Sequence, residues 1–223
     1  MNRLRHLIVY FSAAALLATA ASADEVTLHP IKDTYVQSIN PDTNFGKSVD
    51  MLLGKGTYFG LGFVRGLVQF DLSSLPSNPD LITSAKLSLY QYRTEPAAGG
   101  LPVDVKRITG PWSESTVTWN NHPAYDDSKV WASASVGDSF YTGWIDWNVL
   151  DLVRNQVSGH TQHYGWLLKF YMEIQAGASR LGYFHTMDYA AGPDLRPKLV
   201  VQYVPEPAGV MLATAVAGLI RRR

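Results

Sequence analysis

Residues 107–123 read R-I-T-G-P-W-S-E-S-T-V-T-W-N-N-H-P, and Trp112 and Trp119 enclose a run rich in Ser and Thr. A Gly-Pro pair precedes this run and Asn-Asn-His-Pro follows it, and such clusters interrupt secondary structure. The run between them is therefore predicted to be short and extended, with Val117 and Trp119 on one face. Each Trp brings a large apolar ring and one N–H donor, which suits the rim of a β core. We expect Trp119 to face inward.

On both sides of this stretch the chain consists of short alternating runs separated by turn residues. The clearest alternation extends from Ile82 to Tyr92. One helical pattern follows Asn148, which with Asp151 makes a plausible N-cap pair, and it ends at Gly159. Many short strands with one brief helix predict an all-β, antiparallel sandwich in one domain, 24–204. The other predicted strands are 26–28, 33–39, 51–53, 64–71, 103–108, 144–147, 166–170, 180–185 and 198–203.

Composition excludes several classes of function. The 223 residues include no cysteine, so disulfides, thiolate metal sites and cysteine nucleophiles are ruled out. Hydrophobic residues make up 46% of the chain, enough for a buried core. The formal net charge is zero, which gives no indication of a nucleic-acid partner.

The first 23 residues have the pattern of a secretory signal peptide. Arg3 and Arg5 precede an apolar run from Leu7 to Ala20, and Ala-Ser-Ala at 21–23 is a small-residue cleavage site. We expect an exported protein that begins at Asp24.

The C-terminal end has a second processing pattern. Pro-Glu-Pro precedes the apolar run Ala208–Ile220, and three arginines follow that run. As a helix, the run is about 20 Å long, shorter than the ~30 Å hydrocarbon core, so it is expected to hold the membrane only transiently. An ordinary short membrane anchor, with a transmembrane helix, is the alternative. The candidate sorting residues are Pro205, Glu206, Pro207, Arg221, Arg222 and Arg223.

This tail, 205–223, resembles the PEP-CTERM sorting signal of Gram-negative bacteria. The resemblance implies that an exosortase removes the tail and that the protein reaches the extracellular space or the cell surface. Many proteins with this signal are linked to exopolysaccharide. Without the two end segments, 14 basic and 18 acidic residues remain, which gives the body a net charge of −4.

The body itself resembles the DNRLRE domain, a disaggregatase-related module placed among carbohydrate-binding modules. The resemblance implies a jelly-roll β-sandwich directed to polysaccharide. Relatives that bind acidic glycans carry basic residues on early strands, whereas Gln37 and Gln69 stand there in this chain, beside the single cation Arg65. This departure favours a neutral glycan or a purely structural role. The matching segments are 33–36, 40–46, 68–76, 82–90, 112–120, 164–169 and 193–199.

No motif nominates a catalytic site, and we expect no enzyme. His160 and His163 lie in a loop without a flanking carboxylate, and the adjacent Asp126-Asp127 pair points apart in extended chain. Glycoside hydrolysis needs two carboxylates across a cleft. If the chain were a lyase, Tyr183 with His185 would be the pair to test.

No cofactor is expected, although a structural calcium ion is an alternative for the oxygen-rich residues Asp33, Asn40, Asp42 and Asn44. Asn and Asp are also the common turn residues.

For a glycan site the sequence nominates Arg65, Tyr58 and Phe59. The glycines around the two rings allow a loop that presents aromatic faces, and Arg offers a planar set of donors. Trp131 or Trp144 is the competing platform, and packing of the loop aromatics against each other is the structural alternative. The hypothesis is an exported, non-catalytic module that associates with extracellular polysaccharide. A structural matrix protein and a polysaccharide-degrading enzyme are the alternatives.

Overall fold

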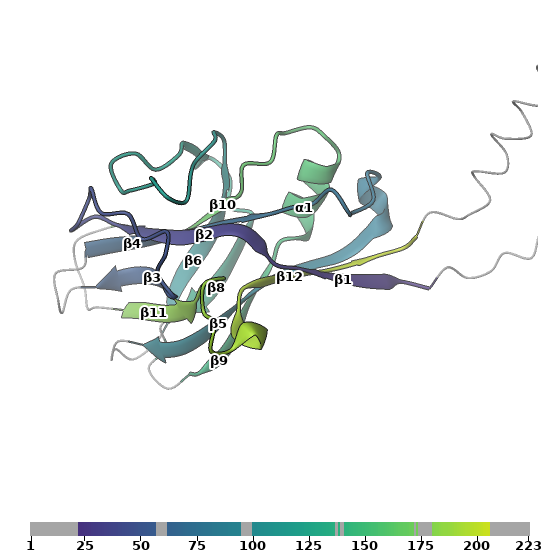
Figure 1. The fold of residues 1–223 in the computed structure, drawn as a ribbon. Coiled ribbons are helices and arrows are strands. Elements are labelled where there is room, and N and C mark those ends of the chain that lie inside the picture. Colours follow the sequence, from purple (N-terminus) through teal and green to yellow (C-terminus); the bar gives the residue numbers. More distant parts are fainter. Residues whose placement is uncertain are drawn as a thin grey trace, which may run out of the picture.

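Antiparallel pairing organises the whole body of the chain (Figure 1). The computed structural model describes residues 22–56, 62–94, 100–136, 138, 141–171, 173 and 180–205. These residues form strands β1 (Asp24–Leu28), β2 (Pro30–Gln37), β3 (Asp50–Gly56), β4 (Gly62–Phe70), β5 (Ile82–Thr94), β6 (Leu101–Ile108), β7 (Tyr125–Asp126), β8 (Ala132–Val136), β9 (Gly143–Asn148), β10 (Trp166–Phe170), β11 (Arg180–His185) and β12 (Lys198–Tyr203). Helix α1 spans Leu150–Val157, and two short 3-10 turns are η1 (Pro79–Leu81) and η2 (Pro193–Leu195).

The sheet curls on itself to make the two layers of a sandwich. One layer contains β1, β12, β5 and β9, and the other contains β2, β4, β10, β6 and β8. Strands β11 and β3 join β5 to β4, so the two layers are continuous at that side. At the other side β8 and β9 lie next to each other without a ladder of hydrogen bonds. The predicted all-β sandwich with one short helix is confirmed.

The main core fills the space between the layers. Its largest enclosed side chains are Trp147 and Trp166, and each indole N–H has a partner. Trp147 donates to the carbonyl of Val103 at 2.8 Å, and Trp166 donates to the side-chain oxygen of Gln156 at 2.9 Å. Gln156 lies on α1, which therefore covers one end of this core.

A smaller second core lies on the outer face of the β2–β4–β10–β6 layer. It consists of Val36, Leu67, Leu167 and Ile108 from the four strands, covered by Trp112 and Val117 from the loop that follows β6. Trp112 donates its indole N–H to the carbonyl of Tyr164 at 2.7 Å. Trp119 is half-buried and packs against this cluster.

The prediction that the segment between the two tryptophans is extended is wrong. Strand β6 ends at Ile108, and the following residues form a loop with a turn at 114–116. The N–H of Val117 returns to the carbonyl of Ser113 at 2.9 Å instead of joining a ladder. Asn44, in another loop, donates its amide to the carbonyls of Glu114 and Val117. Because a distant side chain satisfies these backbone groups, the loop needs no neighbouring strand.

Candidate functional site

Arg65, the cation nominated from the sequence, lies on the outer face of β4 beneath the loop 109–124. On the neighbouring strand β2 its partner in the sheet register is Val36, a member of the second core. Its guanidinium carbon lies 4.2 Å from the centroid of the Trp119 ring, so the planar group stacks on that ring. Nε donates to one carboxylate oxygen of Glu173 at 2.8 Å, and Nη2 binds the other oxygen. The donors expected to meet a glycan are therefore engaged by Glu173.

His122 completes the contacts of the guanidinium. Nη1 of Arg65 lies 2.7 Å from Nε2 of His122, and Nδ1 of that ring lies 3.0 Å from the carbonyl of Pro123. A carbonyl only accepts, so Nδ1 carries the proton and Nε2 accepts from Arg65. Burial, with Arg65 adding to it, lowers the pKa of His122, so the ring is neutral at neutral pH. Burial on its own would lower the pKa of Arg65. The hydrogen bond and the negative charge of Glu173 have the opposite effect, and the pKa of Arg65 is raised overall.

Two lysines from later strands join Arg65. Lys169 of β10 lies 3.9 Å from Glu173 and 3.6 Å from Asp127. Lys106 of β6 lies 3.1 Å from the same Asp127 carboxylate. We call Arg65, Lys106, Lys169, Glu173, Asp127, Trp119, His122 and Tyr125 the Arg65 cluster.

The Arg65 cluster is electrically balanced and mostly enclosed. The three cations Arg65, Lys106 and Lys169 are matched by three carboxylates. Two of these, Glu173 and Asp127, belong to the cluster, and the third is the neighbouring Asp104, which is buried opposite Lys169 in the β6–β10 pair. The side chains of Arg65 and Lys169 are each 10% exposed and that of Lys106 is 6% exposed, whereas Asp127 is 61% exposed. Trp119 and Tyr125 are half-buried, so their rings form the accessible rim of the cluster.

The sequence did not nominate Lys106 and Lys169. The alternation on β6 was visible in the sequence, and it places Lys106 on the same side of the strand as Asp104 and Ile108. The pairing of Lys106 with Leu167 and of Asp104 with Lys169 depends on the register of β6 against β10. No local pattern gives that register.

The other nominated glycan residues have different outcomes. Tyr58 and Phe59 lie outside the described residues. Trp131 and Trp144 are both half-buried, and a lysine lies over each ring: Lys129 at 3.5 Å from the Trp131 centroid and Lys198 at 3.9 Å from the Trp144 centroid.

The nominated catalytic residues do not converge. His163 is bound to the carbonyl of Phe70, whereas His160 is exposed and contacts Ser158. Asp126 faces Arg107 and Asp127 faces Lys106, so this carboxylate pair diverges as expected.

Tyr183 and His185 do lie on one strand, β11. However, His185 is buried and stacked between two parallel rings, 4.5 Å from Tyr92 and 3.6 Å from Tyr189. Such a position suits packing better than proton transfer.

Two of the residues considered for calcium serve other contacts. Asp42 accepts from the Asn120 amide at 2.8 Å, and Asn44 holds Glu114 and Val117. In the part of the chain that the structure describes, no group of three or more His, Asp or Glu side chains could hold a metal ion.

Comparison with known proteins agrees with this architecture. Residues 24–202 match carbohydrate-binding module family 96. The chain belongs to that family.

A gellan lyase from a Bacillus species is 34% identical over 133 residues, which is 58% of this chain. The match covers only 5% of the lyase. This family 96 chain therefore resembles a small segment of a much larger protein.

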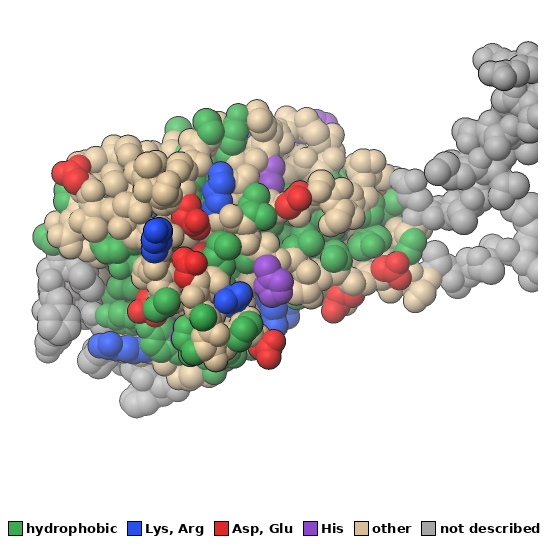
Figure 2. All heavy atoms as spheres, viewed as in Figure 1, with side chains coloured by type: hydrophobic (Ala, Val, Ile, Leu, Met, Phe, Trp, Pro, Cys, Tyr) green, Lys and Arg blue, Asp and Glu red, His purple; other side chains and the backbone are tan. Residues whose placement is uncertain are grey.

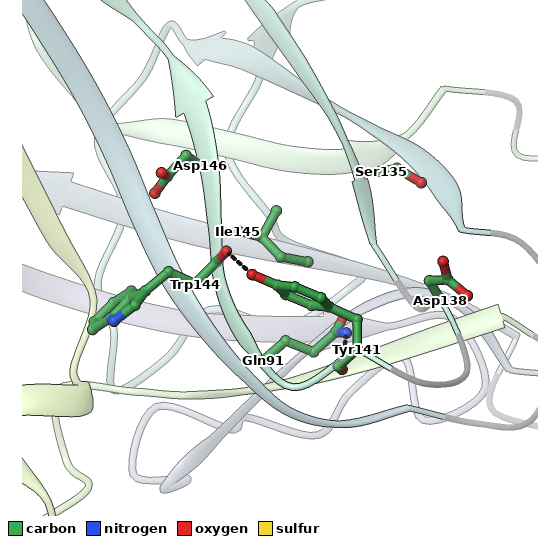
Figure 3. Close-up of a pocket in the computed structure, with 7 residues that line it drawn as sticks. All are labelled: Gln91, Ser135, Asp138, Tyr141, Trp144, Ile145 and Asp146. Atoms are coloured by element: carbon green, nitrogen blue, oxygen red, sulfur yellow. Dashed lines mark hydrogen bonds between the residues drawn. The ribbon is translucent and has the colours of Figure 1, made fainter.

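The family 96 fold also contains a cavity of about 320 Å³ where β8 meets β9 (Figure 3). Ser135 and Asp138 line one side, and Gln91, Tyr141 and Ile145 line the other. Gln91 donates to the carbonyl of Tyr141 at 2.9 Å, and the Tyr141 hydroxyl donates to the carbonyl of Trp144 at 2.6 Å. Figure 3 shows the side chains of Trp144 and Asp146 on the side of β9 opposite Ile145.

Proposed function

We propose that the protein is an exported, non-catalytic module that associates with extracellular polysaccharide. The observation that carries the proposal is the match to a carbohydrate-binding module family along nearly the whole body of the chain. The predicted signal peptide and sorting tail agree with an extracellular location. The tail lies outside the described residues apart from Pro205, and none of the described helices is long and apolar enough to cross a membrane.

The candidate catalytic groups that the structure describes are engaged in structural contacts. Among the described residues, the carboxylates in the Arg65 cluster are engaged by cations, and His185 is enclosed by aromatic rings. The similarity to gellan lyase covers 5% of that protein, a share that suits an accessory module. By analogy, gellan is one polysaccharide to test.

For the site, we propose the rim of the Arg65 cluster. The half-buried Trp119 and Tyr125 would meet sugar rings, while Arg65 supports Trp119 from beneath. Tyr58 and Phe59, which lie in the sequence between β3 and β4 and outside the described residues, remain the proposed partners. Because the charges of the cluster are balanced, a neutral glycan is favoured and added salt should change retention little. Acidic and basic side chains are also interspersed on the face shown in Figure 2.

A structural matrix protein is the second candidate, since the cluster is mostly enclosed and could serve only to hold the loop 109–124. A glycan array with protein comprising residues 24–204 distinguishes the two functions. Binding to at least one polysaccharide, reduced in Trp119→Phe and Tyr125→Phe variants of unchanged stability, supports the proposed function and site. An array without any bound glycan would instead support the matrix role. Assays for new reducing ends and for unsaturated uronates, both expected to be negative, test the absence of catalysis.

A further inference from the structure

A row of aromatic side chains crosses the sandwich layer opposite the Arg65 cluster. The rings of Trp144 and Tyr90 meet edge to face at 5.4 Å, and Tyr90 lies 6.1 Å from His185 in a nearly parallel plane. Tyr92 stacks on His185 at 4.5 Å and meets Tyr183 at 6.3 Å. We call Trp144, Tyr90, His185, Tyr92 and Tyr183 the aromatic row. It joins three neighbouring strands, β9, β5 and β11.

Strand geometry places Trp144, Tyr90 and Tyr92 on the outer face. Alternate residues of a strand point to opposite sides, and Leu87 and Leu89 of β5 belong to the main core. Tyr90 and Tyr92 therefore point away from it. Trp144 is paired directly across from Tyr90, and its side chain lies on the side of β9 away from the core residue Ile145 (Figure 3).

Tyr183 packs against the main core, and His185 is buried with Tyr189 stacked on it at 3.6 Å. Core packing does not account for the other three rings. Of the described residues, Trp144, Tyr90 and Tyr92 belong to neither hydrophobic cluster, and all three are half-buried. Neighbouring aromatic rings that are partly exposed and outside the cores often mark a binding site.

Polar groups suited to hydroxyl recognition flank the row. Asp146, two residues after Trp144, accepts from Ser88 at 2.6 Å and faces Lys86 at 3.0 Å. At the other end, Asp50 accepts from the Tyr92 hydroxyl at 2.8 Å. Binding sites commonly combine an apolar surface with a few fixed polar groups at its margin, and this surface has that composition.

We infer that the accessible part of the aromatic row, Trp144, Tyr90 and Tyr92, binds a polysaccharide chain by stacking with its sugar rings, as a contact surface separate from the Arg65 cluster. The sugar chain would lie over β9 and β5, with its hydroxyls toward Asp146 and Asp50. The inference rests on the proposed polysaccharide association but not on the proposed rim site. Trp144 and Tyr90 are the residues expected to contribute most, because both are partly exposed and lie outside the cores.

Affinity electrophoresis tests the inference with purified full-length protein, in native gels that contain either gellan or hydroxyethyl cellulose. We expect Trp144→Ala and Tyr90→Ala each to weaken retardation roughly tenfold, a change of ~1.4 kcal/mol. Trp144→Phe keeps an aromatic ring and should lie between the wild type and Trp144→Ala. If Trp144→Ala does not fold, the retardation of Tyr90→Ala and Trp144→Phe is compared with that of the wild type instead.

Trp131→Ala is the matched control. Trp131 is also a half-buried Trp beneath a lysine, but among the described residues it has no aromatic ring neighbour. It should therefore keep wild-type retardation. Wild-type retardation of folded Trp144→Ala and Tyr90→Ala, or an equal loss in Trp131→Ala, would overturn the inference while leaving the proposed function in place. A wild-type protein that is retarded in neither gel and binds no glycan on the array would refute both.

Discussion

Replacing Asp33 by Asn should stabilise the protein above neutral pH. Asp33 lies on β2 and is 1% exposed. One carboxylate oxygen accepts the N–H of Met187 at 2.8 Å, and the other has no hydrogen-bond partner among the described residues. Burial raises the pKa of this carboxyl from 3.8 to about 7, and the nearby charges of Glu114 and Asp188 add to the effect.

The sign of the effect follows from the raised pKa. Below pH 3.8 both the folded and the unfolded chain hold the Asp33 proton, so the group costs no stability. As the pH rises toward 7, the unfolded chain has released the proton while the folded chain retains it, and stability falls. Over about three pH units at 1.36 kcal/mol each, the loss is about 4 kcal/mol. Asn cannot ionise, its oxygen can still accept from Met187, and its amide N–H₂ replaces the unpartnered oxygen.

Urea denaturation at pH 4, 6 and 8 measures this difference. We expect Asp33→Asn and the wild type to be similar at pH 4, with the variant more stable by up to about 4 kcal/mol at pH 8. Asp71→Asn is the control, because the Asp71 carboxyl is exposed and its pKa is lowered by hydrogen bonds from Ser73. It should give no gain at pH 8. An Asp33→Asn variant less stable than wild type at pH 8 would show that the ionised carboxylate is stabilised in the fold.

Three further predictions concern the core, the Arg65 cluster and the tail. Trp119→Ala should cost about 2 kcal/mol, below the usual range for an enclosed Trp because the ring is half-buried; an unchanged urea midpoint would contradict its packing on the second core. Arg65→Ala should cost roughly 3 kcal/mol by leaving Glu173 with only a distant lysine, and Arg65→Met combined with Glu173→Gln should recover most of that loss; a stable Arg65→Ala protein would mean that the pair contributes little. Replacing Glu206 or deleting Arg221–Arg223 should leave tailed protein in the membrane, and mass spectrometry that finds residues 208–223 on the exported wild-type protein would argue against sorting at this tail.

The secondary structure of this protein was largely predictable because strand periodicity is local. The alternation from Ile82 to Tyr92 identified β5, and the spacing after Asn148 identified α1. The predicted N-cap is one residue off, because Val149 occupies that position without a side-chain cap, while the Leu150 N–H donates to Oδ1 of Asn148 at 3.2 Å. The stretch between Trp112 and Trp119 misled the prediction. Its backbone partners include Asn44, about 70 residues earlier in the chain, and local patterns carry no trace of such a contact.

The candidate surfaces were much less predictable. The sequence nominated Arg65, but it could not show that Glu173 would engage it or that Lys106 and Lys169 would lie beside it. It also named Trp144, Tyr183 and His185 without showing that Tyr90 and Tyr92 connect them.

Local periodicity predicts which residues of the strands are extended and which side of each strand is apolar, because those properties repeat every two residues along one segment. Which strands are neighbours, and in what register, depends instead on the tertiary structure. Pairing β10 with both β4 and β6 brought the three cations to one face, and pairing β5 with β9 and β11 aligned the aromatic row on the other. Register is chosen when the curled sheet closes around its core, so it depends on the burial of the whole chain at once.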